Sequence, residues 1–222
     1  MKKFLRFAIL PICALALVGC SSDKDIKKAE ALDYSKDVFS AETVLKKYES
    51  VSYKRTVTLD IEEAKVVKNK DKTIDEEKTN HNKAVLAELE TLYKVSEVDQ
   101  KEVNLDVTNI DQFFFGEAFV NEFEKDYKAD NITPAYTKLK KGGLRVSTTY
   151  SKAFDDNQLS VLLGSKEGGM AVKSIVTSDK QGCIISTSGT YSAAIDVDGD
   201  DNADVQYAFS VEVTFNWKAK TE

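Results

Sequence analysis

The stretch of this chain with the clearest chemistry is an acidic run over residues 196–204, which reads DVDGDDNAD. Four carboxylates stand at positions 1, 3, 5 and 9 of the run. Calcium takes six to eight hard oxygen ligands, and alternate side chains on a tight turn converge on one point. The spacing predicts a structural Ca²⁺ site that ties two strand ends together. Its ligands are the side chains of Asp196, Asp198, Asp200 and Asp204 and the backbone carbonyl of Asn202.

The spacing resembles the DxDxDxxxD calcium loops of integrin-type FG-GAP repeats and, less closely, those of dockerins and EF-hands. Two positions depart from the EF-hand pattern: Asp201 replaces the usual glycine at position 6, and Tyr207 replaces the bidentate glutamate at position 12. The alternative is an ordinary polar turn, since Asp, Gly and Asn all favour turns. Residues 181–216 contain no Lys or Arg. The five aspartates therefore need either a metal ion or a lysine from a distant segment.

A second residue with predicted chemistry is Cys20. Lys2, Lys3 and Arg6 precede an apolar stretch that ends in Leu-Val-Gly-Cys, and this order resembles the signal peptide and lipobox of bacterial lipoproteins. The resemblance implies cleavage before Cys20 and a diacylglycerol on its sulfur, hence a lipid anchor at the outer face of a cell membrane or outer membrane. About a dozen apolar residues are too few for a transmembrane helix, which needs about 20.

The composition limits the classes of partner and of chemistry. Cleavage would remove residues 1–19, with three basic residues and no acid, leaving 28 basic and 37 acidic residues and a net charge of −9. Bulk electrostatics then disfavour nucleic acid as a partner. Cys13 leaves with the signal and Cys20 is acylated, so Cys183 has no cysteine to pair with.

No motif of a known enzyme class is present: the sequence lacks a Gly-rich phosphate loop, GxSxG, HExxH and a Cys/His pair. His81, the only histidine, lies in the charged stretch 68–83, which we expect to be a solvated loop. We therefore predict a protein that is not an enzyme. An enzyme is the weakest of three interpretations and would require a cleft in which acids from separated segments converge with raised pKa values.

An aromatic ridge is expected on a helix that starts at Asn109, because aromatic residues recur every four positions there. As part of a packed core, the ridge would fit a binding or structural module. The other interpretation is a cavity for a hydrophobic ligand, as in half-barrel lipoproteins of the LolA/LppX type, which this chain resembles only in expected architecture. The residues that would line such a cavity are Phe115, Phe119 and Phe123.

Hydrophobic periodicity predicts the elements that must position these residues. We expect helices over about 41–50, with Ser40 as its N-cap, and 82–94, besides the helix from Asn109. Strands are expected over about 53–62, 103–107, 144–152, 158–164, 170–178, 183–195 and 204–218.

The predicted helices lie mainly in the first half of the chain, and a meander of strands follows them. This order predicts an α+β fold, with N-terminal helices on one face of a curved antiparallel β-sheet. The domain organisation that we expect is a signal peptide over 1–19, a lipidated N-terminus and charged spacer over 20–39, and one domain over 40–222. The expected function is that of a membrane-anchored module that binds an unknown protein or a hydrophobic small molecule.

Overall fold

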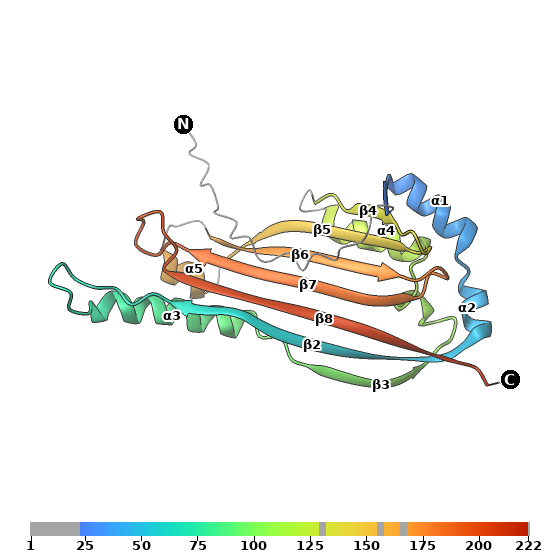
Figure 1. Cartoon of the computed structure of the whole chain (residues 1–222), viewed down its shortest axis with the longest axis horizontal. Coiled ribbons are helices and arrows are strands. Elements are labelled where there is room, and N and C mark those ends of the chain that lie inside the picture. Colours follow the sequence, from blue (N-terminus) through green and yellow to red (C-terminus); the bar gives the residue numbers. More distant parts are fainter. Residues whose placement is uncertain (1–22, 129–131, 155–157, 165–167, 222) are drawn as a thin grey trace.

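One antiparallel sheet organises the fold in the computed structural model, which describes residues 23–128, 132–154, 158–164 and 168–221 (Figure 1). Within these residues the sheet has eight strands in the order β1-β4-β5-β6-β7-β8-β2-β3. The strands are β1 (Lys24–Ile26), β2 (Tyr48–Ala64), β3 (Val98–Asn104), β4 (Ala135–Lys138), β5 (Leu144–Ala153), β6 (Gly169–Ser178), β7 (Ile184–Ile195) and β8 (Val205–Ala219).

The consecutive strands β4 to β8 form the expected meander, and β2 pairs with β8 along almost its whole length, from Tyr48 opposite Ala219 to Ala64 opposite Val205. The α+β class and the antiparallel sheet are therefore confirmed. The helices are α1 (Lys28–Val38), α2 (Ala41–Lys47), α3 (Glu76–Leu92), α4 (Glu117–Lys128) and α5 (Gln158–Leu163), with a 3₁₀ turn at Ile110–Gln112.

Two hydrophobic clusters lie on the same face of the sheet. Phe215 and Trp217 of β8 belong to the cluster beside α1, α2 and α4, and Phe209 and Val211 belong to the cluster beside α3 and α5. These four residues are separated by even steps along one strand, so their side chains face the same side. The helices thus cover the two ends of a single sheet face, as Figure 1 shows.

Sequence periodicity placed several boundaries correctly. Ser40 caps α2, because its hydroxyl accepts a hydrogen bond from the backbone N–H of Thr43 at 3.2 Å. The strands expected over 144–152, 170–178, 183–195 and 204–218 correspond to β5, β6, β7 and β8.

The strand expected over 158–164 is wrong, since Gln158–Leu163 forms the helix α5. Leu159, Val161 and Leu163 alternate as they would in a strand. However, Leu159 and Leu163 are four residues apart, which places both on the buried side of a helix, while Val161 is 78% exposed. A run this short fits both periods, and the packing against α3 decides between them.

The expected spacer also differs from the structure. Residues 24–26 form β1 at the sheet edge, and α1 packs against the first cluster with Ala31 and Ser35 buried. Small residues at these positions let the helix approach the sheet closely, so few large apolar side chains are needed. Residues 23–39 are therefore part of the folded domain.

Candidate functional site

The acidic run forms the loop between β7 and β8, and only part of it converges. One carboxylate oxygen from each of Asp196, Asp198 and Asp204 lies within 4.8 Å of the others, which is close enough to share a cation. The carboxylate of Asp200 does not join this group: it accepts the backbone N–H of Asn202 at 2.9 Å, and the Asn202 side-chain amide donates to the carbonyl of Asp200 at 3.3 Å. The backbone carbonyl of Asn202 stays a predicted ligand.

The three converging carboxylates already have partners within the loop. Asp196 accepts hydrogen bonds from the backbone N–H groups of Gly199, Asp200 and Asp201 at 2.5, 3.2 and 2.8 Å. Asp198 accepts the N–H of Asp200 at 3.2 Å. The aspartates therefore act as acceptors that fold the loop on itself, as short acidic side chains commonly do in turns.

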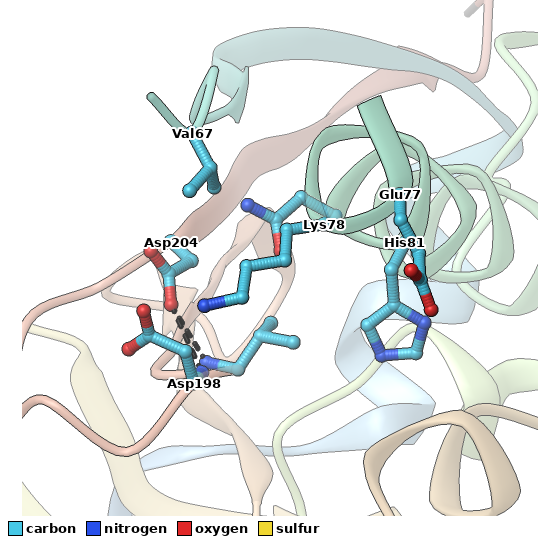
Figure 2. A pocket seen from close by; sticks show the side chains of 8 residues that line it. Val67, Glu77, Lys78, His81, Asp198 and Asp204 are labelled. Atoms are coloured by element: carbon cyan, nitrogen blue, oxygen red, sulfur yellow. Dashed lines mark hydrogen bonds between the residues drawn. The ribbon is translucent and has the colours of Figure 1, made fainter. Parts of the chain in front are cut away.

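Asp204 is the buried member of the group, with a side chain that is only 1% exposed. Its Oδ2 accepts the backbone N–H groups of Val197 and Asp198 at 3.0 and 3.2 Å, and its Oδ1 lies 2.9 Å from the Nζ of Lys65 (Figure 2 draws the first two bonds). A buried carboxylate is costly without such compensation. Lys65 is thus the distant cation that the sequence left unidentified.

Lys65 reaches this position because it follows β2, whose last residue Ala64 pairs with Val205. A backbone hydrogen bond also holds this segment, because the N–H of Lys65 donates to the carbonyl of Asp204 at 2.8 Å. The hydrogen bond to Asp204 is the main cause that raises the pKa of Lys65, and its charge attraction to Asp204 adds to the shift. No local signal marked Lys65, which is 139 residues from its partner.

The backbone of the loop explains the departure from the EF-hand pattern at position 6. Asp201 has a φ of 67°, in the left-handed region that usually favours glycine. Asp tolerates this conformation better than most residues, because its short polar side chain bonds locally. The loop therefore forms the expected sharp turn without the usual glycine.

A cavity of about 600 Å³ opens beside the loop, between the end of β2 and the start of α3. It is lined by Val67, Glu77, Lys78, His81, Asn82, Val197, Asp198 and Asp204. In Figure 2 the Lys78 side chain extends toward the acidic loop, whereas Glu77 and His81 lie together on the other side. The lining brings opposite charges together, but it contains no serine, threonine or cysteine nucleophile.

His81 lies on α3 rather than in the solvated loop that we expected. The helix starts at Glu76, with the Asp75 carboxylate accepting the N–H of Lys78 at 3.1 Å as an N-cap. Thr79 and Asn82 are buried on the inner side of this first turn. This part of the helix packs through polar side chains; for example, the amide of Asn82 donates to the carbonyl of Lys65 at 3.0 Å. Because these buried positions are not apolar, hydrophobic periodicity did not predict the helix here.

The aromatic ridge is packed within the first hydrophobic cluster. Phe115 is fully buried and precedes α4, while Phe119 and Phe123 lie on it half-buried. The ring centroids of Phe115 and Phe119 are 4.8 Å apart, and those of Phe119 and Phe123 are 5.7 Å apart. These rings line neither the cavity beside the acidic loop nor a second cavity beside β1 and β4. This packing favours the core interpretation over the ligand cavity.

The expected helix from Asn109 is broken. Residues 110–112 form the 3₁₀ turn, and α4 begins only at Glu117, because the N–H of Phe115 donates to the carbonyl of Gly182 at 2.7 Å instead of continuing a helix. The predicted lipidation site, Cys20, lies outside the described residues.

No helix of the described residues has both the length and the apolar character needed to cross a membrane.

Comparisons with protein-family models, with curated proteins and with solved structures found no significant match to this chain.

Proposed function

We propose that this chain is a bacterial lipoprotein, acylated at Cys20, which holds one α+β domain at the outer face of a membrane as a non-enzymatic binding or structural module. The observation that carries the proposal is the order of charge, apolar stretch and Leu-Val-Gly-Cys over residues 1–20. Two or more acyl chains anchor a protein far more firmly than one. An acidic surface does not prevent such an anchor.

The arrangement of the domain supports a binding or structural role. The lining of the cavity beside the acidic loop contains no serine, threonine or cysteine nucleophile, and the aromatic ridge is packed into the core. A hydrophobic-ligand carrier needs an apolar cavity of several hundred Å³, and the packing of Phe115, Phe119 and Phe123 gives that alternative no support.

The anchor is tested by growing cells with labelled palmitate and isolating the protein. Wild type and the control Cys13→Ala, which changes a cysteine inside the predicted signal, are expected to incorporate label. Cys20→Ala is expected to incorporate none. Label that persists in Cys20→Ala, or is missing from wild type, would contradict the proposal.

Calcium binding at the loop is a second prediction, favoured by the convergence of Asp196, Asp198 and Asp204. Lys65 opposes it, because its ammonium already neutralises Asp204. We expect calcium to compete with this ammonium, so Lys65→Met should bind calcium more tightly than wild type in a calorimetric titration. If neither protein binds calcium near millimolar concentration, and Asp198→Ala keeps wild-type thermal stability, the prediction is wrong.

A further inference from the structure

The end of the sheet that carries the turn between β4 and β5 is basic, in contrast to the chain as a whole. From residue 132 to 147, around this turn, the sequence has four basic residues and no acid, although the chain contains 37 acids. Lys140 and Lys141 are exposed in the turn itself. We call the exposed lysines Lys140, Lys141 and Lys180 at this end of the sheet the basic end.

Lys180 joins this group through the packing of two turns. Gly142 and Gly143 have φ values of 82° and 94°, and a Cβ placed on Gly142 would lie 2.8 Å from the Cβ of Lys180. The turn between β4 and β5 therefore lies directly against the turn between β6 and β7. Three exposed lysines from two turns share one small surface.

Two acids beside these turns, Asp179 and Asp23, have partners within the protein. Asp179 accepts the backbone N–H groups of Gln181 and Cys183 at 2.8 and 3.0 Å. Asp23 accepts the N–H of Lys140 at 3.1 Å and lies 3.7 Å from Arg145. Among the ion pairs between described residues, none involves Lys140, Lys141 or Lys180. Their positive charge is directed to the solvent.

The chain reaches this same end just after Cys20. β1 pairs with β4 in the antiparallel direction, with Lys24 opposite Lys138 and Ile26 opposite Tyr136. Asp23 and Lys24, the first described residues, therefore lie beside the turn that holds Lys140 and Lys141. Three peptide links join Cys20 to Asp23, and they span at most about 11 Å.

We propose that the basic end is a docking surface for anionic lipid headgroups, so that the domain stands on the membrane with the turn between β4 and β5 lowermost. The inference rests on the proposed anchor at Cys20, because that anchor brings this end to the bilayer. Charge complementarity supplies the second contact, as polybasic segments next to a lipid chain commonly do. The acidic loop then lies at the far end, about 40 Å away along the 12 residues of β7.

The experiment supplies the tether chemically, so that it does not depend on natural acylation. The chain from Cys20 to Glu222, which keeps every described residue, is coupled through Cys20 to a maleimide lipid in vesicles. Cys183 does not compete, since it is buried and burial raises its pKa to about 12. The vesicles contain phosphatidylcholine alone or with about one third phosphatidylglycerol.

Lysine acetylation is then followed by mass spectrometry. We expect Lys140, Lys141 and Lys180 to react several-fold more slowly on the anionic vesicles than on the neutral ones. Lys68 and Lys70, exposed at the far end of the molecule, should react equally on both and serve as internal controls. The protection should disappear at about 1 M salt, where charges are screened beyond about 3 Å.

A charge-reversal pair sharpens the result. Lys140→Glu with Lys141→Glu should abolish the protection of Lys180, whereas Lys68→Glu with Lys70→Glu, which changes the net charge equally, should preserve it. Equal reaction rates on both vesicles, or equal protection of Lys68 and Lys70, would overturn the proposal. Protection by a soluble acidic polysaccharide but not by vesicles would also overturn it and assign the surface to such a polymer. A negative footprint leaves the palmitate result at Cys20 unaffected, so the two failures are distinguishable.

Discussion

Two turns at opposite ends of one sheet carry opposite charge, and they handle it differently. In the loop between β7 and β8, the carboxylates accept backbone N–H groups, and the buried one also pairs with Lys65. In the turn between β4 and β5, Lys140 and Lys141 are exposed. The short side chain of an aspartate reaches the backbone N–H groups of its own turn, whereas the ammonium of a lysine stands at the end of a long, flexible side chain. The acidic loop is therefore a structural device, and the basic end is the surface that is open to a partner.

The largest loss of stability is expected where the turn between β4 and β5 contacts the turn between β6 and β7. A Cβ on Gly143 would collide with the carbonyl oxygen of Ser178 and with the backbone of Asp179, in a left-handed conformation. Gly143→Ala should cost about 3 kcal/mol or more of unfolding free energy. Gly164→Ala is the matched control, because Gly164 also has a positive φ of 67° but no atom within 4 Å of the added Cβ; it should cost about 1 kcal/mol. Equal losses in chemical denaturation would show that the two turns are not in tight contact.

The next effect tests the acidic loop as a structural device. Asp204→Ala removes the acceptor of two backbone N–H groups and the partner of Lys65, so it should cost about 2–4 kcal/mol. The Lys65 side chain is 43% exposed, so water screens its ion pair with Asp204. Most of the loss of stability therefore comes from the two backbone N–H groups that lose their acceptor. Asp198→Ala, at an exposed position, should cost less than about 1 kcal/mol. Denaturation in calcium-free buffer measures both variants, and a loss for Asp198→Ala as large as that for Asp204→Ala would contradict this view of the loop.

A smaller and opposite effect is expected on the sheet face between the two ends. The hydroxyl of Thr148 on β5 is buried and has no hydrogen-bond partner. Thr148→Val keeps the shape and removes this unsatisfied group, so it should stabilise the fold by about 1 kcal/mol. The control Thr149→Val faces the other side at an exposed position and should change stability by less than about 0.5 kcal/mol. A destabilised Thr148→Val would indicate that the hydroxyl has a partner in solution.

The smallest effect is expected on the stability of the fold at acidic pH. Hydrogen bonds from the backbone N–H and then the side chain of Asn202 lower the pKa of Asp200. A lowered folded-state pKa gives stability that is present above the unfolded pKa, about 3.8, and is lost as pH falls through the folded value. Asp200→Asn should therefore lose less stability than wild type between pH 7 and pH 3. Asp201→Asn removes the same charge from the neighbouring position and is the comparison, and identical acid sensitivity of Asp200→Asn and wild type would contradict the prediction.

The sheet was predictable from the sequence because its strands alternate over long stretches, as β8 does from Val205 to Trp217. Segments that pack through small or polar residues were not predictable in this way. α1 packs through Ala31 and Ser35, and the N-terminal part of α3 packs through Thr79 and Asn82. Hydrophobic periodicity therefore missed α1 and predicted α3 too short. The short run at α5 satisfied both periods.

At the acidic loop, the sequence identified the converging group but not its counter-charge. Asp196, Asp198 and Asp204 share one turn, so their spacing alone brings them together. Lys65 joins them through the pairing of β2 with β8, a long-range contact that no local pattern encodes. Asp200 stands outside the converging group, because its carboxylate accepts the backbone N–H of Asn202, whose own backbone carbonyl stays a predicted ligand.

We propose that this domain is anchored by lipid at Cys20, three residues before Asp23 at its basic end. Mass spectrometry of the N-terminal tryptic peptide from the native membrane protein is the sharpest test of this anchor. We expect a peptide that begins at Cys20 and carries diacylglycerol on the sulfur. A peptide that retains residues before Cys20, or one with an unmodified Cys20 thiol, would show that the anchor is absent.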